Sequence, residues 1–225
     1  MVFTGLTALA MIASCFLVFV YAPKDKTMGI SQKIFYLHVP IAWISLLAFI
    51  VIFVCSILYL AKDNILYDDI TRASAKIGLV FNTLMLATGS IWGKSAWGVW
   101  WTWDPRLTSS LILWFIYVCY IVVRNSSFEG QRSSKFAAII GIIGFADIPV
   151  IALATTLWPT LHPSEMIFQG GVTGPMLVTL IICIVAFTLF YLLLMILTVT
   201  IQQMEGITTE MDISSNSEEL EENQK

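Results

Sequence analysis

The sequence predicts an all-α membrane protein with six transmembrane helices joined by short loops. Of its 225 residues, 58% are hydrophobic and only 12% are charged, and the mean hydropathy is +0.84. A soluble domain of ordinary composition has about 25% charged residues. The composition therefore excludes a globular enzyme whose surface faces water.

Six apolar runs carry this prediction, because each is long enough, or nearly so, to cross about 30 Å of hydrocarbon. They cover residues 3–22, 39–61, 75–92, 107–123, 136–157 and 175–203. The first run has no basic segment before it and no small-residue cleavage site before Pro23. We therefore expect an uncleaved span rather than a signal peptide, and a single transmembrane domain over residues 1–203.

Residues 204–225 differ from the rest of the chain. They hold seven acidic residues and one basic residue, a contribution of −6 to the net charge of −3, so the remaining body is +3. The stretch is polar and without periodicity, which predicts a disordered tail. We assign it no function.

The distribution of Lys and Arg predicts the orientation of the spans. The loops after the second and fourth runs, with the tail, hold seven basic residues: Lys62, Arg72, Lys76, Arg124, Arg132, Lys135 and Lys225. The other three loops hold five: Lys24, Lys26, Lys33, Lys94 and Arg106. This excess predicts that both termini are cytoplasmic, and that the loops before the second, fourth and sixth runs share the outer face.

The loop at 92–109, WGKSAWGVWWTWDPRLTS, holds five of the chain's eight tryptophans: Trp92, Trp97, Trp100, Trp101 and Trp103. An interfacial belt places one or two Trp residues at the end of a span. Five favour a flat aromatic platform for a large planar apolar ligand. In a helix, Trp97, Trp100 and Trp101 would share a face. Asp104 and Pro105 are typical of the N-cap and first position of the next helix.

The pairs Trp97-Gly98, Trp100-Trp101 and Trp103-Asp104 resemble the WWD signature of the haem-handling membrane proteins of cytochrome c biogenesis. The continuation Arg106-Leu107-Thr108-Ser109 and the preceding GSIWGK, residues 89–94, resemble the CcmC family of haem exporter proteins. The resemblance runs from about Ala22 to Gly174 and does not cover the acidic tail.

The resemblance implies a function without catalytic residues. Such proteins hold haem b as transient cargo at the outer face of the inner membrane and present it to the haem chaperone CcmE. Their partners are the CcmA–CcmB transporter and the small protein CcmD, besides haem and membrane lipid; nucleic acid is not expected. The chain has no GxxxxGK[ST] motif, so any ATP-driven step must come from a partner.

The chain has only two histidines, His38 and His162, each beside a proline at an expected outer membrane boundary. A single interfacial His is commonly a solvated or capping side chain. Two that flank the Trp-rich loop favour haem iron, for which imidazole is a usual axial ligand. The resemblance implies that both are axial ligands. Without a nearby Cys or acid at ligand spacing, the pair makes a poor zinc site.

Several polar residues have two interpretations. Lys94 and Arg106 bracket the Trp-rich loop and are candidates to bind haem propionates, because a guanidinium pairs with a carboxylate bidentately; Arg106 at a span end is equally consistent with snorkelling. Asp104 belongs to the motif but is also the expected helix cap. Asp147, inside the fifth run, either satisfies backbone groups freed by Pro149 or has a polar role near the haem path or a partner helix.

The remaining features leave two rival functions open. The four cysteines, Cys15, Cys55, Cys119 and Cys183, lie inside apolar runs and are expected to be small core residues without disulfides, and there is no CxxCH motif. One rival is a cytochrome c haem lyase of the same superfamily, against which the short length argues. The other is a non-haem protein whose Trp loop binds quinone or anchors the bundle. Trp43, outside the motif, is expected to matter little.

Overall fold

The computed structural model describes residues 1–24, 29–126, 130–158 and 174–222. These ranges contain helices and no strand. Six helical segments are long and apolar enough to cross a membrane: Val2–Tyr21, Ile30–Lys62, Ile65–Trp97, Pro105–Arg124, Gln131–Ala154 and Gly174–Thr208. Each contains most of one predicted apolar run. The predicted all-α fold with six spans is confirmed.

The helices follow one another with short connections. Helix α1 (Val2–Phe16) ends in a π-helical turn, η1 (Leu17–Tyr21), and α2 (Phe35–Lys62) is preceded by a 3₁₀ turn, η2 (Ile30–Ile34). The others are α3 (Ile65–Trp97), α4 (Pro105–Arg124), α5 (Gly130–Gly144), α6 (Asp147–Leu157) and α7 (Gly174–Glu222).

Helix α2 begins before the predicted span. We expected His38 to lie in a loop that ends at Pro40, whereas His38 is in the first turn of α2 and Pro40 lies inside the helix. Pro40 is the sixth residue of α2 and has no N–H to donate to the carbonyl of Tyr36, so the helix continues through it with one backbone hydrogen bond fewer. His38 is therefore held by helix rather than by loop.

Helix α3 also begins earlier, ten residues before its apolar run. Asn64 starts it, because its side-chain oxygen accepts a hydrogen bond of 3.0 Å from the backbone N–H of Leu66. Arg72 and Lys76, which we counted as loop residues, lie in this helix. The apolar run underestimates α3 because some polar residues of its first turns, such as Asp68, are buried inside the bundle.

The fifth span is broken between α5 and α6. Pro149 lacks a backbone N–H, and its ring clashes with the carbonyl four residues earlier in a regular helix, here that of Phe145. The chain relieves this with tighter bonds, from the N–H of Ala146 to the carbonyl of Ile143 at 3.1 Å and from that of Ile148 to Phe145 at 3.1 Å. Pro149 therefore predicts that the fifth span is interrupted nearby, but the sequence does not predict that α5 ends at Gly144 and α6 begins at Asp147.

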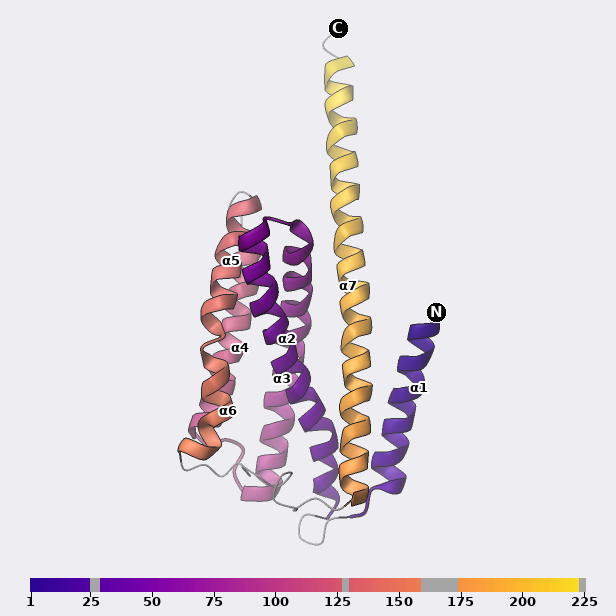
Figure 1. Ribbon diagram of the computed structural model, residues 1–225, viewed down its shortest axis with the longest axis vertical. Coiled ribbons are helices and arrows are strands. Elements are labelled where there is room, and N and C mark those ends of the chain that lie inside the picture. The colour runs from indigo at the N-terminus through magenta and orange to yellow at the C-terminus, as the bar shows by residue number, and fades with distance from the viewer. Residues whose placement is uncertain (25–28, 127–129, 159–173, 223–225) are drawn as a thin grey trace.

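The stretch predicted to be a disordered tail is helical in the structure. Helix α7 continues past the bundle as far as Glu222 (Figure 1). Extending an existing helix adds one backbone hydrogen bond per residue without a new nucleus, and Met, Glu and Gln favour helix. The acidic stretch is therefore helical because it continues the helix of the sixth span.

The helices form a bundle with one outlying pair. Helix α2 packs against α3, α5 and α7, and α4 packs against α3, α5 and α6, while α1 packs against α7 (Figure 1). Phe49 of α2 and Tyr117 of α4 meet edge-on in the largest buried cluster, with ring centroids 5.1 Å apart. The start of α2 and the 98–104 connection lie at the same end of the bundle, the lower end in Figure 1.

The cysteines only partly match their predicted place in the core. All four are free, but Cys15 and Cys119 are exposed, Cys55 is partly exposed, and only Cys183 is buried. Each lies on a transmembrane helix, so an exposed thiol faces hydrocarbon rather than water. A small apolar side chain is suited to either environment.

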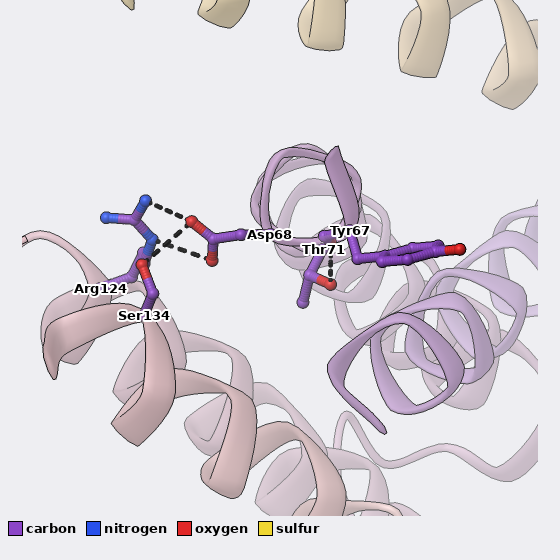
Figure 2. Close-up of polar contacts among 5 residues, drawn as sticks. All are labelled: Tyr67, Asp68, Thr71, Arg124 and Ser134. Carbon is purple, nitrogen blue, oxygen red and sulfur yellow. Dashed lines mark hydrogen bonds and ion pairs between the residues drawn. The ribbon is translucent and has the colours of Figure 1, made fainter. Parts of the chain in front are cut away.

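A buried ion pair ties three helices together at the opposite end from His38. Asp68 of α3 is 2% exposed and accepts from Nη2 of Arg124 on α4 at 2.6 Å and from its Nε at 3.3 Å. The hydroxyl of Ser134 on α5 donates to the same carboxylate at 3.0 Å (Figure 2). Asp68, Arg124 and Ser134 form a clamp between α3, α4 and α5. The carboxylate of Asp68 can be buried in the first turn of α3 because these two side chains pair with it.

We predict that Arg124→Met destabilises the protein strongly. Removing one partner of a buried pair leaves an uncompensated charge, which costs about 3–5 kcal/mol. Thermal unfolding of the purified protein in detergent measures this. Lys135→Met is the matched control, because Lys135 pairs with Asp63 at 3.6 Å with side chains 46% and 55% exposed, and such pairs contribute about 0–1 kcal/mol. Equal losses in the two variants would contradict the clamp.

Candidate functional site

His38 lies against helix α3 in a fixed position. Its Nδ1 atom is 2.9 Å from the hydroxyl oxygen of Thr88. A Cβ atom added to Gly89 would lie only 3.1 Å from Cε1 of the imidazole. The missing side chain at residue 89 therefore lets the ring pack against the backbone of α3.

The imidazole lines a cavity of about 290 Å³ between the ends of several helices. The wall combines a few polar side chains with a mainly apolar surface. Its polar members are His38, Ser45, Arg106 and Ser110, and three indole rings, Trp43, Trp92 and Trp97, also line it. A mostly apolar hollow with few polar groups is the usual form of a small-molecule site, and this volume is at the lower end of the usual range of about 300–1,000 Å³.

Arg106 brings a positive charge to this cavity. Within the described ranges, its guanidinium has no hydrogen bond or salt bridge. The nearby carboxylate of Asp104 is already engaged, since Oδ1 accepts from the backbone N–H groups of Arg106 and Leu107, and Oδ2 accepts from Thr102. The guanidinium is thus available to an anionic group that enters the cavity.

Asp104 caps helix α4, as predicted. Its Oδ1 lies 3.1 Å from the backbone nitrogen of Arg106 and 3.2 Å from that of Leu107. Pro105 occupies the first position, where no N–H is needed. The cap fixes where α4 starts, and hence where Arg106 projects.

The tryptophans do not form the flat, shared helical face that we expected. Helix α3 ends at Trp97, and Gly98 adopts a left-handed conformation with φ of 78°, so the helix cannot carry Trp100 and Trp101. Trp92 and Trp97 meet edge-on with centroids 5.1 Å apart, as Trp101 and Trp103 do at 5.8 Å. Four of the five rings therefore form two nearly perpendicular pairs rather than one plane.

The structure divides the predicted tryptophans between two places. Trp92 and Trp97 line the cavity beside His38. Trp100 and Trp103 are 59% and 76% exposed on the connection between α3 and α4. The structure therefore places His38, Arg106, Trp92 and Trp97 around one cavity. The other three tryptophans do not line it and follow on the connection between α3 and α4.

Three further residues lie apart from this cavity or outside the described residues. The Nζ atom of Lys94 donates to the carbonyl of Gly98 at 2.8 Å, which satisfies the end of α3. Asp147 lines a separate hollow between α4, α5 and α6, and its buried Oδ2 atom has no hydrogen bond with any described residue. The carbonyl of Phe145, which Pro149 leaves without its usual partner, accepts from the backbone N–H of Ile148 instead, so this oxygen of Asp147 gives no support to the interpretation that the residue satisfies the backbone there. His162 lies outside the described residues.

Sequence reasoning missed several residues of the cavity. Trp43, expected to matter little, lines it, and Thr88 and Gly89 position the imidazole. A helical signal was present, because Met85, Gly89 and Trp92 follow i, i+4, i+7 spacing and all line the cavity. The early start of α2 gives His38, Ala42 and Ser45 the same spacing.

The fold defines a multi-pass membrane protein, and one end of its bundle contains a mainly apolar cavity with a few polar side chains. Comparison with known proteins is more specific. The CcmC family, described as "Heme exporter protein C", matches residues 1–213. This chain belongs to that family.

The relatives cover most of the chain. Heme exporter protein C of Bradyrhizobium diazoefficiens is 35% identical over 176 residues, which is 77% of this chain and 67% of the relative. The protein of the same name in Escherichia coli K12 is 34% identical over 194 residues, 86% of this chain and 77% of the relative. A putative cytochrome c biosynthesis ccmC-like mitochondrial protein of Marchantia polymorpha is 40% identical over 166 residues, covering 74% and 68%.

We predict that Asp104→Ala lowers stability by about 0.5–2 kcal/mol, the usual cost of losing an N-cap. Asp104→Asn should retain most of the stability that the cap provides, because the amide oxygen can accept the same two backbone hydrogen bonds. Thermal unfolding in detergent distinguishes the two. An Asn variant as unstable as the Ala variant would mean that the negative charge, rather than the cap, is what α4 needs.

Proposed function

We propose that this chain handles haem during cytochrome c maturation and holds it as cargo in the cavity beside His38. The observation that carries the proposal is the pairing, in one hollow, of an imidazole with a guanidinium that forms no salt bridge with any described residue. Haem needs both, because its iron takes axial imidazole and its propionates are anions. The names of the relatives, heme exporter proteins, support the same conclusion.

The chain's own residues fit this cargo in stated roles. His38 binds the iron from one side, and His162, through its match to the family, from the other. Trp92 and Trp97 contact the porphyrin inside the cavity, and Trp100, Trp101 and Trp103 shield the part that extends from it. Arg106 binds a propionate, and Asp104 positions Arg106 through the helix cap.

The small size of the cavity suits a site that must release its cargo. A volume near 290 Å³ admits only part of a macrocycle, so an edge of the haem stays accessible at the end of the bundle. We propose that this edge is what the chaperone CcmE receives. The CcmA–CcmB transporter and CcmD are the proposed membrane partners, with any ATP-driven step on their side.

The proposed orientation puts this end of the bundle outside the inner membrane and both termini in the cytoplasm. The basic residues and the family resemblance support it. Single cysteines at Lys94 and Ser126, in a cysteine-free background, test it with a membrane-impermeant thiol reagent on intact cells. We expect residue 94 to react and residue 126 to be protected. The reverse pattern would contradict the orientation.

We predict that the haem-loaded protein is six-coordinate and that His38→Gly makes it five-coordinate. The expected signs are a shifted Soret band and a changed spin state, with the original spectrum restored by added imidazole, because glycine leaves space for it. His162→Gly should behave in the same way. An unchanged spectrum in His38→Gly would remove His38 from the iron.

We also predict that Trp92→Ala and Trp97→Ala each weaken haem binding by at least about fivefold, since an aromatic contact contributes on the order of 1 kcal/mol beyond its area. Trp43→Ala should act in the same direction, because its ring lines the same cavity. Trp114→Ala is the control: Trp114 lies on α4, and its Nε1 donates to Thr83. Haem titration of the purified variants measures these changes. Equal losses in all four would indicate a general effect on the bundle.

A further inference from the structure

Three threonines of the described helices share one hydrogen-bonding arrangement with a ring on a neighbouring helix. Thr83 donates to the carbonyl of Leu79 at 2.8 Å and accepts from Nε1 of Trp114 at 2.8 Å. Thr188 donates to the carbonyl of Ile184 at 2.7 Å and accepts from Nε1 of Trp43 at 3.1 Å. In both, the direction is certain, because an indole nitrogen can only donate.

Thr88 repeats this arrangement with His38 in place of a tryptophan. Its hydroxyl lies 2.7 Å from the carbonyl of Leu84, four residues earlier, and 2.9 Å from Nδ1 of His38. A threonine hydroxyl has one hydrogen; in Thr83 and Thr188 the backbone carbonyl takes it, and the same arrangement assigns the hydrogen of Thr88 to the carbonyl of Leu84. The hydroxyl can then only accept from the ring, so Nδ1 carries the proton.

We infer that Thr88 is a positioning residue that sets the tautomer of His38. With the proton held on Nδ1, the lone pair is on Nε2, the nitrogen left to bind iron. Gly89 keeps the ring in this pose by leaving room for Cε1, 3.1 Å from where a Cβ would lie. The inference rests on the proposed function for its purpose, but the tautomer itself does not depend on haem.

A partner that accepts a hydrogen bond from the far nitrogen of a ligating imidazole does two things. It fixes the ring orientation, and it makes the ligating nitrogen more basic. A more basic ligand stabilises ferric iron, so loss of the hydroxyl should weaken haem binding and raise the reduction potential. Changes of this kind usually cost about 10–100-fold in metal affinity.

The tautomer can be measured without haem. Solid-state NMR of the haem-free protein in bilayers, with ¹⁵N-labelled histidine, distinguishes protonated from bare ring nitrogens. His38→Gly identifies the signals of His38, since the chain has only two histidines. We expect Nδ1 protonated and Nε2 bare in the wild type, and a mixture of tautomers in Thr88→Val. A proton fixed on Nε2 in the wild type would overturn the inference while leaving the proposed function standing.

Haem binding then tests the consequence. Thr88→Val should lower haem affinity about 10–100-fold and raise the potential, while Thr88→Ser, which keeps the hydroxyl, should stay close to wild type. Thr83→Val is the matched control, since it removes an identical hydroxyl arrangement on the same helix but faces Trp114. A Thr88→Val protein with unchanged affinity and potential would overturn the positioning role.

A final comparison needs no substitution at residue 88. In haem-loaded His38→Gly, imidazole should bind the iron about tenfold more tightly than 1-methylimidazole, which has no N–H to donate to Thr88, in keeping with the cost of losing such a partner. The preference should vanish in His38→Gly/Thr88→Val. Equal affinities in the single variant, or an undiminished preference in the double variant, would overturn the inference. Failure of the wild type to bind haem would instead remove the proposed function and this role with it.

Discussion

The close contact of α2 with α3 is the constraint on which the site depends. Because residue 89 has no side chain, the imidazole of His38 can lie against α3 without being displaced, with Nδ1 2.9 Å from the Thr88 hydroxyl. The same contact places the C-terminal part of α3, with Trp92 and Trp97, beside the cavity. At the other end of the bundle, the clamp around Asp68 holds α3 to α4 and α5, so α4 carries Arg106 to the cavity in a defined register.

In the proposed function, this arrangement allows one site both to hold and to release a cargo. The proposed iron ligand, His38, and the proposed propionate partner, Arg106, lie near helix ends, where packing and the Asp104 cap restrict their rotamers, so both are in place before a cargo binds. The rings of Trp100 and Trp103 lie on the exposed connection between α3 and α4, where segments are more mobile than a packed helix. In the proposed function, the residues on the packed helices bind the cargo, and the exposed connection moves when the cargo is released.

The sequence alone predicted the class of fold, because hydrophobic runs report spans directly, and it singled out four residues that line the cavity, His38, Trp92, Trp97 and Arg106. The sequence-based predictions failed where contacts between helices, rather than hydropathy, determine the length of a helix or the position of a side chain. Asp68 and Arg124 extend α3 beyond its apolar run, and Gly98 ends it before Trp100 can share its face. Trp43 was set aside because it lies outside the motif, yet the packing of α2 brings it to the same cavity. Contacts between helices are not encoded in spacing along one of them.

The most direct test of this account is pulsed electron paramagnetic resonance on the ferric, haem-loaded protein grown with ¹⁵N-labelled histidine. The technique detects nitrogen nuclei that are bonded to the iron and separates labelled histidine from the unlabelled porphyrin. If both histidines bind the iron, the wild type shows strong coupling to two labelled nitrogens, His38→Gly keeps only the one from His162, and the double variant His38→Gly/His162→Gly shows none. Bound haem with no coupling to a histidine nitrogen, or the same two couplings in His38→Gly as in the wild type, would contradict the central claim.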